Sequence, residues 1–168
     1  MTRFSLRLPQ RQARLVALAV AYHLARPGSE LDRDTMREYE HGLAEVPHAL
    51  EPQLDAEAAT LEIDPLQVTL LSSAMSWLVN ELKTYSMLDA MAGDSGRPRS
   101  AAPGFDDKLR SLFPDVAADP AAASDLAGEA AMLRRQLPLA RAREALEERR
   151  SAERKERARK KPWQLWKR

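Results

Sequence analysis

The sequence predicts a mainly α-helical fold. We expect a compact helical bundle, with a short two-stranded β-ribbon from residues 4–8 and 60–64, followed by a linker and an extended, charged C-terminal helix. Apolar residues recur at helical spacing through much of the chain as far as Leu137, and prolines and glycines divide them into helices of ordinary length. Between Ala140 and Lys161 Leu146 is the only large apolar residue, while opposite charges recur at a spacing of four.

The first part of the chain contains the predicted ribbon strand and three helices. Apolar and polar residues alternate over residues 4–8, which is typical of a half-buried strand. A helix is expected from Gln10 to Ala25, before the stop signal of an Arg-Pro-Gly sequence. A second helix should begin near Ser29. A third, shorter helix should carry one apolar stripe, formed by Leu50, Leu54, Ala58 and Leu61.

The clearest helix start is the sequence Asp64-Pro65-Leu66-Gln67. Asp64 suits the N-cap position, proline suits the first helical position, and Gln67 can reach back to the N-cap amide. The helix should continue to about Met91, which makes it about 40 Å long at 1.5 Å per residue. Its expected inward face consists of Leu71, Met75, Leu78, Leu82, Tyr85 and Leu88.

An internal repeat is a further hypothesis. Residues 6–24 and 61–79 both have the order strand, turn and apolar helix. The alignment of these two segments matches Leu6 with Leu61, Gln12 with Gln67, and Tyr22 with Trp77. Pairing of the two strands would join the two units, although two amphipathic helices share an apolar period without any duplication.

Composition divides the chain into four segments. Residues 1–91 are the predicted helical core domain. Residues 92–104 contain three Gly, two Pro and two Ser, a composition typical of a flexible linker. Residues 105–137 should form short helices, with Phe105, Leu109, Leu112 and Phe113 on one side of the first. Residues 138–168 form a basic helical arm, and they end in the sequence KKPWQLWKR.

Charge is distributed unevenly along the chain. Residues 149–168 contain ten Lys or Arg and two Asp or Glu, a net charge of +8, whereas the whole chain carries +1. The preceding residues therefore sum to −7. An acidic body with a basic arm indicates that the arm has a partner. The chain contains no cysteine, and its longest apolar run extends only from Leu15 to Tyr22. We therefore expect a cytoplasmic protein.

No catalytic signature is recognisable in the sequence. Glu45 and His48 have the spacing of a Glu-x-x-His metal motif, but Pro47 lies between them and no second such motif exists. Neither a glycine-rich phosphate loop nor a nucleophile motif occurs. We expect no catalytic residues, no metal and no cofactor, and the sequence favours a non-catalytic protein.

The tip of the arm carries the candidate partner-binding residues. Trp163 and Trp166 are separated by one helical turn, which would direct both indoles toward one surface. The predicted partner-binding residues are Trp163, Leu165, Trp166, Lys160, Lys161, Lys167 and Arg168. The candidate phosphate contacts are Arg154, Lys155, Arg157 and Arg159.

Several partners fit this composition. Aromatic residues beside arginine are typical anchors for a protein partner, which is the first hypothesis. Nucleic acid is the second, because Lys and Arg neutralise phosphates and Trp stacks on unpaired bases. Association of the tail with a membrane surface, or an enzyme without a recognisable motif, comes third. A homo-oligomer through helix 65–91 is also predicted, because Val68, Val79 and Met87 lie away from its main apolar stripe.

Replacing both Trp163 and Trp166 with Ala should leave the melting temperature unchanged, because the part of the arm that precedes them is too polar to pack. Partner binding should weaken by about 2–4 kcal/mol, the usual scale for tryptophan hot spots. Acrylamide should quench both tail indoles and leave Trp77 protected. Protection of all three indoles in the free protein would show that the tail folds back on the body.

Overall fold

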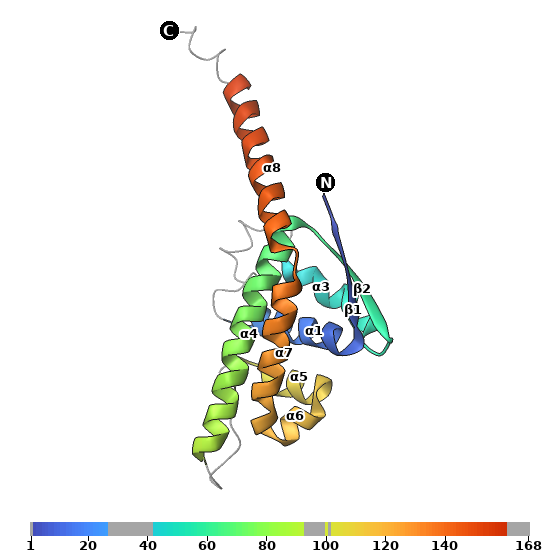
Figure 1. The fold of residues 1–168 in the computed structure, drawn as a ribbon, viewed down its shortest axis with the longest axis vertical. Coiled ribbons are helices and arrows are strands. Elements are labelled where there is room, and N and C mark those ends of the chain that lie inside the picture. The colour runs from blue at the N-terminus through green and yellow to red at the C-terminus, as the bar shows by residue number, and fades with distance from the viewer. Residues whose placement is uncertain (1, 27–41, 93–99, 101, 161–168) are drawn as a thin grey trace.

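The computed structural model describes residues 2–26, 42–92, 100 and 102–160. Within these residues the chain is mostly helical with one small two-stranded antiparallel sheet, as the sequence predicts (Figure 1). The elements are β1 (Phe4–Pro9), α1 (Gln10–Ala25), α3 (Val46–Leu50), β2 (Ala58–Ile63), α4 (Pro65–Ala92), α5 (Phe105–Leu112), α6 (Pro114–Ala118), α7 (Ala123–Gln136) and α8 (Leu139–Lys160). Three single 3-10 turns lie at Leu43–Glu45, Glu51–Gln53 and Pro120–Ala122.

Strands β1 and β2 form the predicted ribbon, with bounds close to the expected ones. Phe4 pairs with Ile63, Leu6 with Leu61, and Leu8 with Ala59. These side chains face the core, while the residues between them are exposed. The alternation of polar and apolar residues therefore predicts both the strands and the side that each strand buries.

The strand register agrees with the proposed internal repeat. The repeat alignment gives each residue of 4–8 a counterpart in 59–63. When these residues are exchanged for their counterparts, the five pairs from Phe4–Ile63 to Leu8–Ala59 are recovered, with Leu6–Leu61 at the centre. The first residues of α1 and α4, Gln10 and Pro65, are matched by the same alignment. Both observations fit two strand–helix units related by a local two-fold axis through the ribbon.

The predicted third helix is wrong in its second half. Leu50 ends α3, but Ala58 and Leu61 belong to β2 rather than to a continuous helix. Gln53 marks the change of structure, because its side chain bonds to the backbone of Thr60 in both directions, at 2.9 and 3.2 Å. The apolar spacing of this segment fits a helix and a strand about equally, and the tertiary partner β1 decides between them.

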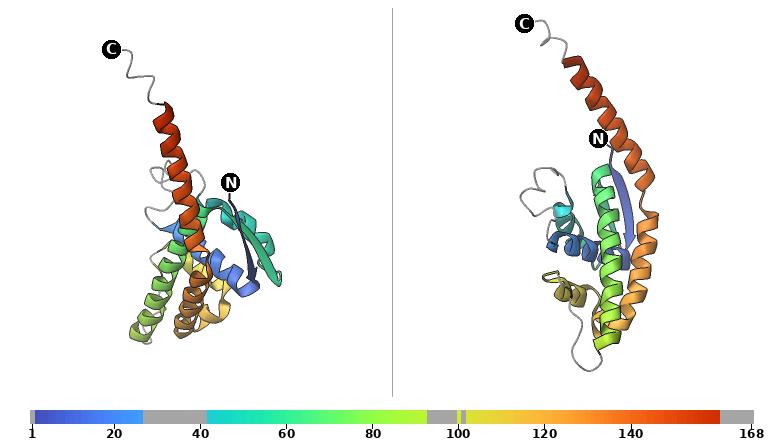
Figure 2. Two further views of the ribbon diagram at one scale, coloured as in Figure 1. Left: turned by 45° about the horizontal axis from the view of Figure 1, so that its top comes forward. Right: turned by 90° about the vertical axis from the view of Figure 1, so that its left-hand side faces the viewer.

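Helix α4 is the centre of the body. It contacts both α1 and α7, and in the right-hand view of Figure 2 α1 crosses behind it while α7 runs beside it. Most of its predicted inward residues are buried, namely Leu71, Met75, Leu78, Leu82 and Tyr85. Leu88 is 43% exposed, because helical spacing places it about 120° from Leu82, outside the buried side of α4. Val68 is fully buried, so it does not belong to a second apolar side as predicted.

Residues 105–137 share one hydrophobic core with residues 1–91. Phe105, Leu109, Leu126 and Leu133 belong to the same buried cluster as the apolar residues of α1 and α4. Helix α7 packs along α4, and α5 packs on α1. The segment between α4 and α5 therefore connects parts of one core rather than two separate cores.

Polar contacts also join the helices of the body. Arg11 on α1 makes a bidentate ion pair with Glu129 on α7, at 2.7 and 3.0 Å. Tyr22 on α1 donates a hydrogen bond of 2.8 Å to Glu81 on α4. Burial and this hydrogen bond raise the pKa of Tyr22 to about 12, so the phenol remains a donor at neutral pH. These bonds fix the angles at which α1, α4 and α7 meet.

Helix α8 is packed at its start and exposed over the rest of its length. Leu139 and Ala142 contact the core, and Ala145 and Leu146 are half-buried against α4. From Glu147 to Arg159 every side chain is exposed. Figure 1 shows this outer part of α8 extending past the other helices. The outer part spans about 21 Å at the helical rise of 1.5 Å per residue.

Replacing Leu78 with Asp should unfold the protein or lower its unfolding free energy by more than about 4 kcal/mol, because the site is fully buried. Urea denaturation monitored by circular dichroism measures the change. The control is Ser124→Asp, which adds the same carboxylate at an exposed position in the first turn of α7. Equal stability of the two variants would contradict the burial of Leu78 in the core.

Candidate interaction surfaces

The start of α4 is fixed by the predicted capping box. The backbone N–H of Gln67 donates to Asp64 Oδ1 at 2.8 Å, and the backbone N–H of Asp64 donates to Gln67 Oε1 at 3.0 Å. Gln67 Nε2 also donates to the carbonyl of Gly42 at 3.1 Å. Helix α4 therefore begins at a defined residue, and the loop before α3 is tied to it.

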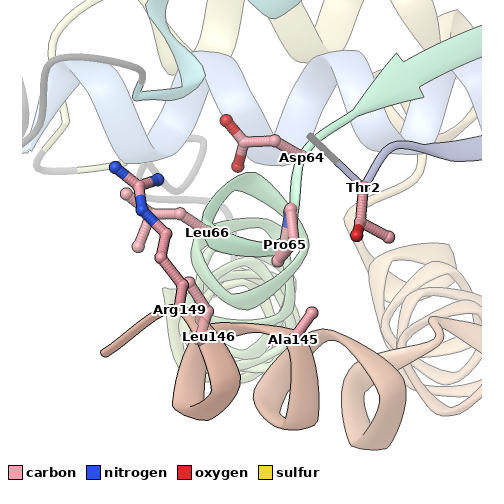
Figure 3. A pocket seen from close by; sticks show the side chains of 7 residues that line it. All are labelled: Thr2, Asp64, Pro65, Leu66, Ala145, Leu146 and Arg149. Atoms are coloured by element: carbon pink, nitrogen blue, oxygen red, sulfur yellow. The ribbon is translucent and has the colours of Figure 1, made fainter. Parts of the chain in front are cut away.

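A cleft of about 430 Å³ lies beside this cap, between the start of α4 and the inner part of α8. Figure 3 shows Ala145, Leu146 and Arg149 on α8 facing Pro65 and Leu66 on α4. Thr2 and Asp64 complete the lining. The cleft is mainly apolar, with a carboxylate and a guanidinium at its margin. Such a site fits an apolar side chain flanked by polar groups.

Four arginines form a stripe along one side of α8. Arg143, Arg150, Arg154 and Arg157 fall within about 60° of one another at 3.6 residues per turn, and all four are exposed. We call this set the arginine stripe. The opposite side carries Arg141, Glu144, Glu148, Lys155 and Arg159, so its net charge is only +1 against +4 for the stripe. The guanidinium group binds carboxylates and phosphates in a bidentate manner, so the stripe suits an acidic partner.

The predicted phosphate contacts are divided between the two sides of α8. Arg154 and Arg157 belong to the arginine stripe, whereas Lys155 and Arg159 lie on the opposite side. The predicted partner-binding residues lie outside the described side chains: the structure describes only the backbone of Lys160, and Lys161, Trp163, Leu165, Trp166, Lys167 and Arg168 fall in the undescribed residues 161–168.

Leu146 connects the cleft to the arginine stripe. It lines the cleft, and its spacing from Arg143 and from Arg150 makes it a neighbour of both on the helix surface. Leu146 is not among the residues predicted from the sequence to be functional. Its isolation could have indicated it, because Leu146 is the one large apolar residue between Ala140 and Lys161. Its partner Leu66 gave no such signal, since it resembles the other apolar residues of α4.

Trp77 is not protected in the body, contrary to the sequence-based prediction. It is 46% exposed, and the guanidinium of Arg26 lies 3.8 Å from its ring centroid. Helical spacing accounts for this exposure, because Trp77 lies about 120° from Leu71 and about 140° from Leu82, outside the buried apolar stripe. An acrylamide experiment on the tail must therefore use a Trp77→Phe background.

The charged residues of outer α8 support the helix itself. Arg149 Nε lies 3.0 Å from Glu153 Oε1, which is the i, i+4 spacing expected from the sequence. An exposed pair of this kind contributes about 0.3–0.5 kcal/mol. The pair also orients Arg149 at the margin of the cleft.

In the part of the chain that the structure describes, no three His, Asp or Glu side chains lie close enough together to hold a metal ion. Among the described helices, none combines the length and the apolar character that a membrane crossing requires. Comparisons of the chain with family models, with curated proteins and with solved structures find no match.

Replacing Asp64 with Ala should lower the unfolding free energy by about 1 kcal/mol, because one amide of the first turn of α4 loses its acceptor. The variant Gln67→Ala should cost more, since it removes both the second half of the capping box and the bond to Gly42. Urea denaturation of the wild type and the two variants measures their unfolding free energies. A smaller effect for Gln67→Ala would contradict the role of this residue in tying the loop to α4.

Proposed function

We propose that this chain is a non-catalytic interaction protein, an adaptor or accessory subunit, whose C-terminal arm binds a protein partner. The observation that carries the proposal is the continuity of the cleft and the arginine stripe through Leu146. A partner segment would insert an apolar side chain between Leu66 and Leu146 and place carboxylates against Arg150 and Arg154. The tail residues Trp163 and Trp166 remain the predicted second anchor, on the same arm.

The apolar cleft favours a protein partner over nucleic acid. Nucleic acid presents phosphates and flat bases, and neither fills a narrow apolar cleft between two leucines. A peptide combines aliphatic and acidic side chains in one segment. Protein recognition of this kind depends on an apolar anchor at the centre and charged groups at the rim.

Nucleic acid is the second candidate, because the outer part of α8 and the tail carry a net positive charge. Contacts to phosphates would involve Lys and Arg side chains from all sides of the helix, since the backbone of a nucleic acid is a continuous line of charge. For a protein partner, the affinity should depend on which Lys or Arg is changed, whereas for nucleic acid it should depend only on the total charge.

A pair of charge-matched variants tests the proposal. One carries Arg150→Glu and Arg154→Glu within the arginine stripe, and the other carries Lys155→Glu and Arg159→Glu on the opposite side. Each changes the net charge by the same amount. With a partner captured from nuclease-treated extract, the stripe variant should weaken binding at least about tenfold, and its control should change binding less than about twofold.

A variant in the cleft and the salt dependence of binding test the proposal independently. The variant Leu146→Asp should weaken binding as much as the stripe variant, with an unchanged helical content by circular dichroism. An equal loss in both charge variants, together with a steep fall of affinity with salt, would favour nucleic acid instead. Unchanged binding in all three variants would show that the arm is not the binding element.

A further inference from the structure

One side of α4 is exposed and carries no charged residue. It consists of the exposed Ser73, Trp77, Asn80, Thr84, Met87 and Leu88 and of the half-buried Leu70, and we call it the uncharged face. Met87 is 64% exposed, and Trp77 and Leu88 are 46% and 43% exposed. In the right-hand view of Figure 2, α1 passes behind α4 and α7 runs beside it, and no described helix crosses in front of α4.

The absence of charge on this face is informative, because 30% of all residues in the chain are charged. Between Leu66 and Leu88 the charged residues of α4 are Glu81 and Lys83, and helical spacing puts both at the edges of the face. Depletion of charge together with exposed Trp and Met is the composition of an interface core. A partner for the uncharged face must itself be uncharged over about 25 Å of helix.

The order of residues makes the uncharged face complementary to the same face of a second copy of the chain. Leu70, Ser73, Trp77, Asn80, Thr84 and Met87 are separated by alternating steps of three and four, so the spacing is the same from either end. In an antiparallel pair, Leu70 would lie opposite Met87 and Ser73 opposite Thr84. Trp77 would lie opposite Asn80. Apolar residues then meet apolar residues, and hydroxyl groups meet hydroxyl groups.

The polar side chains of the face can be buried at low cost. Ser73 Oγ already donates to the carbonyl of Thr69 at 3.2 Å, and Thr84 Oγ1 donates to the carbonyl of Asn80 at 3.0 Å. Neither hydroxyl would be left without an acceptor in a dry interface. The indole N–H of Trp77 is a donor, and the side-chain carbonyl of Asn80 is an acceptor, so this cross pair is complementary.

Trp77 is held in place before any partner binds. The guanidinium of Arg26 covers one face of its ring at 3.8 Å, and Arg26 also lies 5.9 Å from the ring of Tyr22. Tyr22 in turn donates to Glu81, so a cation and a carboxylate belong to the same cluster in each copy. A preorganised aromatic side chain loses little conformational entropy on binding.

We propose that the protein forms a two-fold symmetric dimer through the uncharged face of α4, with the two α4 helices antiparallel. This interface is isologous and closes on itself, so it produces dimers rather than open chains. The proposal does not depend on the arm. Two other occupants of the face are a different uncharged protein and residues 27–41 of the same chain, which follow Arg26 directly.

Two matched methionine variants test the interface. Met87 and Met132 are exposed to nearly the same extent, 64% and 62%, but Met132 lies on α7 away from the uncharged face. Sedimentation equilibrium of the full chain should show a dimer whose dissociation constant rises at least about tenfold in Met87→Lys, because two like charges would enter a dry interface. The variant Met132→Lys should dissociate as the wild type does.

Cysteine cross-linking tests the antiparallel arrangement, since the chain has no cysteine of its own. A mixture of Ser73→Cys and Thr84→Cys chains should form disulfide-linked heterodimers readily. Each variant alone should cross-link at least about fivefold less, because identical positions lie about 16 Å apart along an antiparallel pair. Preferential cross-linking of each variant with itself would indicate parallel helices and overturn the proposed arrangement.

The remaining outcomes are also decisive. A monomer at all concentrations overturns the dimer, and protection of Trp77 from acrylamide in that monomer would indicate that residues 27–41 cover the face. A dimer that is equally stable in the wild type and in Met87→Lys would show that the copies associate through another surface.

Discussion

The body depends on the burial of one side of α4. Leu71, Leu78 and Leu82 have no exposed area, and the helices that cover this region come from both halves of the chain: α1 before it and α7 after it. Neither α1 nor α7 can bury its own apolar stripe without α4, so the three helices stabilise one another. The same packing determines which side of α4 stays exposed and where α8 contacts it. Once α1 and α7 occupy two sides of α4, the third side is left exposed along its length, and the first turns of α8 can reach only the N-terminal end of α4.

Those parts of the fold that rest on local chemistry could be predicted from the sequence. Asp64 and Gln67 form both bonds of the capping box, because the bonding groups belong to a single turn of the chain. The ribbon was predictable because its strands alternate polar and apolar residues, and the register follows once Leu6 and Leu61 face the core. The stripe of α4 from Leu71 to Tyr85 follows from helical period alone.

The predictions that were wrong concern residues whose structure depends on other parts of the chain. Leu54 and Ala58 have helical spacing, but Ala58 belongs to β2 because that segment pairs with β1. Trp77 was expected to be protected because it lies in an apolar helix, whereas helical spacing sets it outside the stripe of Leu71 and Leu82, on the side of α4 that α1 and α7 leave uncovered. Of the candidate site, the helical charge pair of Arg149 and Glu153 was predictable. The cleft was not, because it requires α8 to return to the start of α4, and no local signal encodes that return.

The two proposed surfaces have opposite chemistry, and this determines how they would work together. The uncharged face would exclude charged partners, since burying an unpaired charge there is costly, and burying the arginine stripe without acidic partner groups would carry the same cost. Each surface would therefore select a different partner. Because the cleft lies at the N-terminal end of α4, antiparallel pairing would set the two clefts at opposite ends of the dimer, about 37 Å apart along the helix axis. Two arms that point away from each other cannot bind adjacent sites on one short peptide. They would instead engage two separate partner molecules, or two distant sites on a large one, with the gain in avidity that bivalent attachment provides.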